Sequence, residues 1–370
     1  MLIRDKAKHI MLVSGLTFCS LLITQQASVF CGLMIWTAGT VRNIAAPIWV
    51  FDEKLEQVNE AIPMRSIELQ RVRSVEGVAW AVPLYTGLAQ ARLPDGSFQG
   101  MLLVGLDAAS LVGRPAVMTA GRIEDLALPN AVIIDQVGVE KLAAKGVRCE
   151  IGTTFEINDR LARVVGLCRT YRNFTGQPYV FTTADRALEY LPPQRKMLSF
   201  VLAGAQDGVP AEAVAARIAR EPGLEAATRN EIFWRTIWWY VRNTGIPISF
   251  GTVVLLGAIV GIAIAGQTFY LFIHDNSRNL AALKAMGART PLLAAMVITQ
   301  AAWVGGLGYG LGVGLAAQFG RAVYQAGQPP FFMPWQLLVF AAAVILLVCV
   351  IAALIGLAKV VRLEAAQVFR

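Results

Sequence analysis

Long runs of apolar residues occupy the two ends of the chain, and shorter periodic patterns occupy its middle. A helix needs about 20 mostly apolar residues to span the hydrocarbon core of a bilayer. The four runs of that length cover residues 10–38, 246–273, 291–320 and 335–358. The first is longer than the roughly 7–15 apolar residues of a signal-peptide core, so we expect it to be an uncleaved anchor. The pattern predicts an α-helical membrane protein with four transmembrane helices.

The middle region, about 200 residues long, is large enough to form a domain with its own core. Turn-forming residues predict two hairpins, 78–92 with 98–106 and 154–157 with 162–167. Further strands are expected at 47–51, 131–134, 197–203 and 224–227, and helices at 64–74, 135–145 and 210–220. The outer pieces run strand–helix–strand on both sides of a long insert. This order predicts an α+β extracytoplasmic domain with a split ferredoxin-like part and a β-rich insertion at 95–190.

Basic residues are concentrated beside particular ends of the apolar runs. Lys and Arg are enriched on the cytoplasmic side of membrane proteins. The residues in question are Arg4, Lys6 and Lys8, then Arg278, Lys284 and Arg289, then Lys359, Arg362 and Arg370. We therefore expect a multi-pass protein with both termini and the 274–290 loop in the cytoplasm. The expected parts are 1–38, the extracytoplasmic (periplasmic) domain 39–228, an interfacial helix 229–245, and 246–370 with three spans.

Composition supports a bilayer environment, because 56% of the residues are hydrophobic, 16% are charged and the mean hydropathy is +0.54. The formal charge of +8 comes mostly from the cytoplasmic pieces, where nine Lys and Arg face Asp5, Asp275 and Glu364, a net of +6. A polyanion-binding surface is therefore not required, and we expect no nucleic acid partner. With His9 and His274 as the only histidines, we expect no catalytic residues, metal or bound cofactor in this chain.

Two cysteines lie in the polar middle region. If the second hairpin were extended, Cys149 would lie opposite about residue 169, so that a disulfide with Cys168 is geometrically possible. Gly152 can bend the chain before that point, which would leave two free thiols. The sequence leaves both alternatives open.

The segment before the second span is rich in aromatic residues. Thr228 and Glu231 fit a capping box that begins a helix. Its aromatic side chains are Phe233, Trp234, Trp238, Trp239 and Tyr240. Such a helix is expected to lie at the membrane surface. Gly245 and Pro247 then interrupt it, and they form either a simple break beside an aromatic belt or a hinge that links domain motion to the span.

Several residues inside the spans are candidates for contacts with another chain or with substrate. Gln25 and Gln26 lie in the first span, where polar side chains need partners; we expect a permease dimer contact, with a substrate path as the alternative. Met34, Trp36, Ile248 and Phe250 are expected near the outer mouth, either as an apolar contact zone or as lipid-facing residues. Gly306, Gly310 and Gly314 are four residues apart and predict close packing against a neighbouring helix.

A short amphipathic helix is predicted between the second and third spans. Leu280, Leu283 and Met286 share one face, Arg278 and Lys284 flank it, and Gly287 ends it. Its apolar face requires either lipid headgroups or a groove on a cytoplasmic partner.

This segment resembles the "REIALLKALGA" coupling helix of FtsX-like, MacB-type ABC permeases. Residues 361–370 resemble the ending of that family, residues 104–107 its "GVD" strand end, and Gly121-Arg122 followed by 130–134 its "GR…VVL" pattern. Asn279 departs from the usual acidic residue. The resemblance implies that 276–289 is the coupling helix, with Arg278, Asn279, Leu280, Leu283, Lys284, Met286 and Gly287 docking on an ATPase.

The resemblance implies a non-catalytic permease subunit of a bacterial inner-membrane ABC exporter of the mechanotransmission (type VII) kind. No Gly-x-x-x-x-Gly-Lys-Ser/Thr loop is present, so ATP and Mg are expected on a separate ABC ATPase present in two copies, beneath two permease copies forming a homodimer. A periplasmic membrane-fusion protein and an outer-membrane channel often complete such efflux complexes; the sequence leaves them open. The substrate is expected to be hydrophobic or periplasmic.

Two other functions compete with export. One is an FtsX-like signal transmitter that couples ATP cycles to a periplasmic hydrolase without cargo. The large middle domain favours export over this alternative. The other is a membrane enzyme, which the scarcity of histidines and the lack of convergent acidic residues in the spans disfavour.

Overall fold

The computed structural model describes residues 6–191, 197–326 and 328–361. The chain divides into two compact units. The first, here called the helical unit, comprises residues up to Leu33 and from Gly245 onward. The second, here called the mixed domain, comprises Met34–Thr244.

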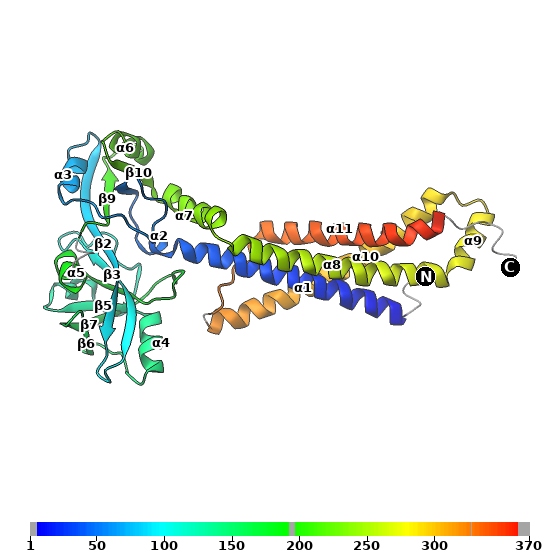
Figure 1. Ribbon diagram of the computed structural model, residues 1–370, viewed down its shortest axis with the longest axis horizontal. Helices are drawn as coiled ribbons and strands as arrows, with labels where there is room; N and C mark the ends of the chain where they lie inside the picture. The colour runs from blue at the N-terminus through cyan, green and yellow to red at the C-terminus, as the bar shows by residue number, and fades with distance from the viewer. Residues whose placement is uncertain (1–5, 192–196, 327, 362–370) are drawn as a thin grey trace. The chain divides into compact units, whose positions relative to one another are not determined.

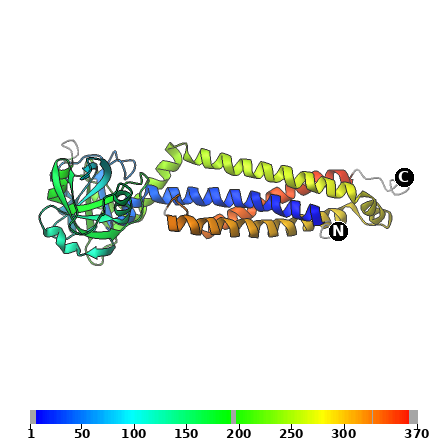
Figure 2. The same ribbon diagram turned by 90° about the horizontal axis from the view of Figure 1, so that it is seen from below.

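The helical unit is built from α1 (Lys6–Thr37), α8 (Ile246–Asp275), α9 (Ser277–Ala285), α10 (Thr290–Ala326) and α11 (Trp335–Val361). Within its described residues, four stretches are long and apolar enough to cross a membrane: Lys6–Thr37, Ile246–Asp275, Pro291–Tyr324 and Trp335–Gly356. The sequence prediction of four candidate spans is confirmed. The long helices run alongside one another, as Figures 1 and 2 show.

Close packing in the helical unit depends on glycines other than those predicted. A Cβ atom added at Gly308 would come within 2.7 Å of the Leu16 Cβ, and one at Gly312 within 2.5 Å of the Ser20 Cβ. Only a glycine therefore permits this contact between α10 and α1. Gly306, Gly310 and Gly314 meet nothing within 4 Å in the described structure, so the prediction that they pack against a neighbouring helix is wrong within this chain.

The described part of the mixed domain contains strands of 4 to 15 residues and helices that cover the sheet. In chain order its elements are α2 (Gly39–Asn43), β1 (Ile48–Asp52), α3 (Ile67–Arg73), β2 (Val78–Arg92), β3 (Phe98–Leu106), β4 (Val117–Gly121), the 3-10 helix η2 (Ile123–Ala127), β5 (Ala131–Asp135), α4 (Gln136–Ala144), β6 (Thr154–Ile157), β7 (Arg160–Arg169), β8 (Tyr179–Thr183), α5 (Ala184–Tyr190), β9 (Phe200–Ala205), α6 (Ala211–Ile218), β10 (Leu224–Thr228) and α7 (Arg229–Asn243).

The described strands follow the order β10-β1-β9-β2-β3-β8-β5-β7-β4, with β6 paired to β2 and β7. The long strand β2 belongs to both halves of this arrangement: its beginning pairs with β9 and its remainder with β3. In the first half, β10, β1, β9 and β2 are all antiparallel to their neighbours, α3 links β1 to β2, and α6 links β9 to β10. Figure 1 shows α3 and α6 beside these strands.

Both predicted hairpins form. β2 and β3 pair antiparallel from Tyr85 with Gly105 to Arg92 with Phe98. β6 and β7 meet at a two-residue turn in which Asn158 and Asp159 both have positive φ. Strands β4 and β8 and helix α5 were not predicted, because their short apolar stretches lack a distinct periodicity.

The disulfide between Cys149 and Cys168 does not form; both thiols are free and buried. Gly152, with φ +97°, turns the chain before the hairpin reaches Cys149. Cys149 packs in the cluster that contains Leu142, and Cys168 packs in a different cluster that contains Phe181. Burial raises the pKa of the Cys149 thiol to about 11 and raises that of Cys168 as well.

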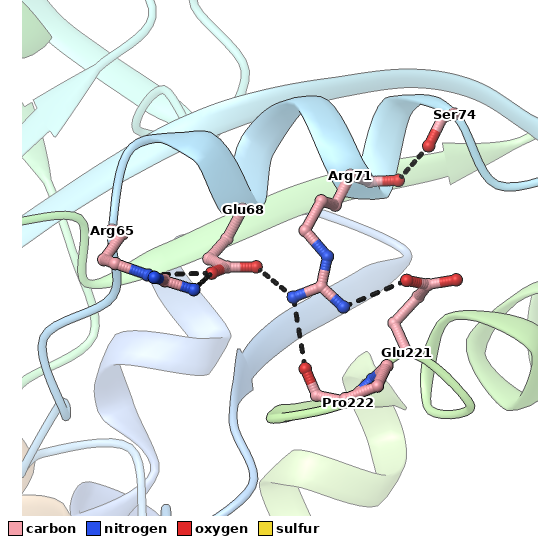
Figure 3. A network of polar contacts seen from close by, with 6 residues as sticks. All are labelled: Arg65, Glu68, Arg71, Ser74, Glu221 and Pro222. Atoms are coloured by element: carbon pink, nitrogen blue, oxygen red, sulfur yellow. Dashed lines mark hydrogen bonds and ion pairs between the residues drawn. The ribbon is translucent and has the colours of Figure 1, made fainter.

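An ion-pair network joins α3 to the link between α6 and β10 (Figure 3). Glu68 of α3 is buried and accepts hydrogen bonds from Arg65 at 3.0 Å and Arg71 at 2.6 Å. Arg71 also reaches Glu221 at 3.0 Å and the Pro222 carbonyl at 3.1 Å, just before β10. The network pairs the buried carboxylate and holds α3 to the link between α6 and β10.

Candidate functional site

The predicted cytoplasmic coupling segment forms α9, which lies between two long helices in the chain. Arg278 and Asn279 are exposed, and Lys284 is half-buried. Met286 caps the helix with 76% of its surface exposed, and Gly287 ends it with φ +98°. A large apolar side chain this exposed beside cationic residues is a surface that a partner can cover.

Not every predicted residue of the coupling segment is equally available. Leu283 is half-buried and packs against the core of the helical unit, so its apolar side chain already has neighbours. The side chain of Leu280 lies outside the described residues. Residues 362–370, which carry the predicted tail resemblance, lie outside them too. Met286 is therefore the predicted apolar residue whose free surface the structure shows best.

The aromatic segment before the second span forms α7, capped as predicted. The Thr228 Oγ1 accepts the Glu231 N–H, and the Glu231 carboxylate accepts from Thr228 in return. Ile232, Ile237 and Tyr240 are buried, whereas Trp234 and Trp238 are 49% and 52% exposed. One face of α7 is therefore seated in the mixed domain while aromatic side chains project from the other.

The helix breaks where the sequence places a break. α7 ends at Asn243 and α8 begins at Ile246 with Pro247 at its start. Thr244 is extended, with φ −122° and ψ 157°. A Cβ atom at Gly245 would meet nothing within 4 Å. Gly245 and Pro247 thus occupy the connection between the helices, and their role as a hinge stays a prediction.

The residues predicted for the outer mouth differ in accessibility. Met34 is only 4% exposed and Trp36 is half-buried, whereas Ile248 is 72% exposed. Phe250 is half-buried and packs against Phe30 of α1, with ring centroids 5.7 Å apart. Gln25 and Gln26 are half-buried on α1.

Phe250 lies in an apolar groove of about 430 Å³ within the helical unit. The helices α1 and α8 and the start of α11 contribute its walls. Its lining residues are Ala27, Phe30, Cys31, Pro247, Phe250, Gly251, Val254, Pro334, Gln336, Leu337 and Phe340. Of the predicted contact residues, Phe250 belongs to the groove, and so does Pro247, which was predicted as part of a hinge. The other lining residues were not predicted, because they come from segments that are distant in the sequence. No single stretch of sequence indicates that these segments lie together.

Two family models match consecutive parts of the chain. Residues 28–221 match the MacB-like periplasmic core domain, and residues 232–365 match the FtsX-like permease C-terminal domain. The chain belongs to the FtsX-like, MacB-type permease family. It is therefore a membrane protein of the ABC transporter permeases, a family that works with ABC ATPases, and the predicted family resemblance is confirmed.

Several solved structures resemble the mixed part of this permease. The extracellular domain of the noncanonic ABC-type transporter YknZ from Gram-positive bacteria is 14% identical, with 49% of this chain and 98% of that chain covered and a TM-score of 0.37. The periplasmic region of MacB from Actinobacillus actinomycetemcomitans is 13% identical, with coverage of 55% and 96% and a TM-score of 0.39. A domain of a permease protein from Porphyromonas gingivalis is also 13% identical, covering 51% and 89% with a TM-score of 0.29. No curated protein matches the chain. The family assignment rests on the sequence profiles.

Proposed function

We propose that this permease is the membrane subunit of an ATP-driven exporter of the mechanotransmission kind, in which a separate ATPase docks on α9. The observation that carries the proposal is the 76% exposed Met286 at the end of a cation-flanked helix between two candidate spans. Burying a methionine side chain is worth about 1.5–3 kcal/mol. A partner protein that covers Met286 would gain that stabilisation, whereas a chain acting alone would leave the residue in water.

In this proposal the docking surface lies in the cytoplasm of a bacterium, below the inner membrane, and the distribution of basic residues supports that orientation. Arg278, Lys284 and Arg289 lie in or beside α9, and Lys6 and Lys8 lie at the start of α1. The positive-inside rule orients both ends toward the cytoplasm. The mixed domain is then periplasmic, as the name of its matching profile implies.

Two copies of the chain and two ATPases would form the working complex. ATP and Mg would be held by the ATPases. Closure of the ATPases would shift α9 and its flanking spans, and the connection at Gly245 and Pro247 would transmit the movement to α7 and the mixed domain. In this scheme the first half of the sheet has the split ferredoxin-like arrangement, which the strand order supports.

The apolar groove around Phe250 offers a contact for a hydrophobic substrate. Its lining is almost wholly apolar, and its volume of about 430 Å³ is in the range of small-molecule sites. A membrane-fusion protein and an outer-membrane channel would carry such a substrate onward from the periplasm. Two-copy assembly, the substrate class and these additional partners are all parts of the proposal.

The first experiment is purification of the tagged full-length chain in mild detergent. ATPase activity is assayed in the eluate, and partners are identified by mass spectrometry. Recovery of an ABC ATPase supports the docking proposal. A chain that reproducibly elutes without any ATPase contradicts it.

A single substitution tests the docking surface itself. Met286→Asp places a charge where the partner's apolar groove is expected, so recovery of the ATPase should fall about tenfold or more. The matched control is Tyr324→Asp, because Tyr324 is 87% exposed near the opposite end of α10. Equal ATPase recovery for the two variants would remove Met286 from the interface.

The partners also separate export from FtsX-like signalling. A co-purifying membrane-fusion protein favours export. A co-purifying cell-wall hydrolase, together with ATPase activity that no hydrophobic compound stimulates, favours the signalling alternative.

A further inference from the structure

A second groove lies on the mixed domain, against the last two turns of α7. It has a volume of about 400 Å³ and is separate from the apolar groove around Phe250. Glu56, Arg235, Trp238, Trp239, Arg242 and Asn243 line it. The groove thus combines one carboxylate, two guanidinium groups and two indoles.

Arg235 is already occupied by the protein. Its guanidinium pairs with Glu225, donates to the Leu55 carbonyl at 2.6 Å, and lies over the ring of Phe51 at 5.2 Å. This residue holds α7 to the sheet. The charges left to receive a ligand are therefore those of Glu56 and Arg242.

Glu56 and Arg242 are each held by one contact within the protein, but each retains hydrogen-bonding capacity. The Trp239 Nε1–H donates to the Glu56 Oε2 at 2.6 Å, and no protein donor reaches Oε1 within the described residues. The Arg242 guanidinium stacks over Trp238 at 5.7 Å. No carboxylate among the residues that the structure describes pairs with Arg242. The groove therefore presents one anionic acceptor and one cationic donor to solvent.

The connection between this groove and the apolar helix α8 is short. Only Thr244 and Gly245 separate Asn243, the end of α7, from Ile246, the start of the apolar helix α8. Three residues of extended chain span at most about 11 Å. Trp234 and Trp238 are half-exposed on the same helix, and tryptophan is enriched at the level of lipid headgroups. Lipid headgroups are therefore the class of ligand considered for this groove.

We infer that this groove binds the headgroup of a zwitterionic aminophospholipid such as phosphatidylethanolamine. Arg242 would hold the phosphodiester, since a guanidinium matches phosphate geometry. The Glu56 Oε1 would accept a hydrogen bond from the primary ammonium, and Trp238 would flank the ligand. The inference goes beyond the proposed export function and does not depend on an ATPase or on cargo.

The pairing of charges distinguishes this lipid from its neighbours in the membrane. Phosphatidylglycerol has the phosphodiester but no ammonium, so it would satisfy Arg242 and leave Glu56 unpaired. Phosphatidylcholine has a quaternary ammonium that donates no N–H to Glu56. The groove should therefore prefer the aminophospholipid over both.

The test uses the full-length chain reconstituted in nanodiscs with equal parts of phosphatidylethanolamine, phosphatidylglycerol and phosphatidylcholine. After transfer to mild detergent, native mass spectrometry measures the lipids that remain bound. The wild type should retain phosphatidylethanolamine at least threefold over either competitor. Equal retention of the three lipids would overturn the inference.

Variants assign the preference to the two residues. Glu56→Gln keeps an oxygen that accepts from Trp239, so the fold is preserved while the preference over phosphatidylglycerol should disappear. Arg242→Gln removes the group that holds the phosphodiester, which all three lipids share. The retention of each of the three lipids should therefore fall at least threefold. The controls are Arg148→Gln and Glu150→Gln, a mutually paired and highly exposed couple far along the chain, which should match the wild type. Retention unchanged in both groove variants would also overturn the inference.

Discussion

In the mixed domain several of the largest side chains are fully buried among the strands, whereas in the helical unit many large apolar side chains are exposed. Trp49, Tyr179 and Phe181 are fully buried among the strands. Trp303 and Leu255 are 63% and 59% exposed on α10 and α8. The close contacts of the helical unit are made instead by small residues, such as Gly312 against Ser20.

The contrast follows from the two solvents. Water drives large apolar side chains inward, at about 25 cal/mol per Å² of apolar surface buried. Lipid chains are as apolar as leucine, so they exert no such force between helices, and close approach of backbones stabilises the bundle. Removing a large buried side chain should therefore be the most harmful change in the mixed domain, and adding a side chain at a close helix contact should be the harmful change in the helical unit.

The largest effect is expected in the sheet core. Trp49 is fully buried and meets Phe200 edge to face at 5.3 Å. Trp49→Ala should lower the free energy of unfolding of the mixed domain by about 3–5 kcal/mol, since it leaves a large cavity. Denaturant unfolding in micelles, followed by near-UV circular dichroism, measures this loss.

A conservative variant at the same position serves as the control. Trp49→Phe keeps an aromatic ring and removes an indole Nε1 that is buried without a hydrogen-bond partner, so its cost should stay below about 1.5 kcal/mol. A loss as large as that of Trp49→Ala would mean that specific shape, rather than buried area, stabilises this core.

The next effect lies in the helical unit, where adding a side chain should be the harmful change. Gly312→Leu would force α10 away from Ser20 and Thr17 of α1, and overpacking of this kind costs about 1–3 kcal/mol. Gly314→Leu, two residues away in open space, should change stability by less than about 0.5 kcal/mol. Thermal unfolding of both variants in the same detergent compares them. Equal destabilisation would show that Gly314 also faces a neighbour, such as a second copy.

The comparison also explains how much of the fold the sequence could predict. Strands with clear alternation and turn residues, such as β2 and β3, were predicted with their boundaries, because each signal is local. The glycines of α10 that pack against a neighbouring helix were predicted wrongly within this chain. Gly306, Gly308, Gly310 and Gly312 all satisfy a spacing of four with another glycine, and only the rotation of the helix decides which pair is buried.

The candidate site was predictable to the same extent. The coupling helix is a contiguous motif, so its residues were found together. That Leu283 packs inward while Met286 is exposed depends on the tertiary packing of α9, which sequence periodicity alone does not give. Each of the two grooves is lined by residues from separate segments, such as Glu56 and Arg242. No local sequence pattern predicts these groups of residues.

A smaller effect concerns a buried carboxyl of the mixed domain. Asp135 caps α4 through Gly138 and accepts from Thr170, yet burial raises its pKa above the ordinary value. A carboxyl with a raised folded pKa holds its proton more tightly in the folded chain, so its contribution to stability falls as pH rises from its unfolded pKa through the folded pKa. Asp135→Asn removes this titration. The free energy of unfolding of wild type minus variant should therefore decrease as pH rises through this range, and an increase would contradict the assigned direction.

The last prediction concerns the reactivity of two cysteines rather than stability. It tests whether the core of the mixed domain excludes water from their thiols. Burial raises the pKa of Cys149 to about 11, and Cys168 is fully buried. Only the thiolate reacts with alkylating reagents, and a rise of two pKa units lowers its fraction at pH 8 about a hundredfold. Both cysteines should therefore resist iodoacetamide in the native protein and react fully in denaturant without reductant, as peptide mass spectrometry would show. A pair that stays unmodified in denaturant until a reductant is added would instead be a disulfide, and the turn at Gly152 would then have to open.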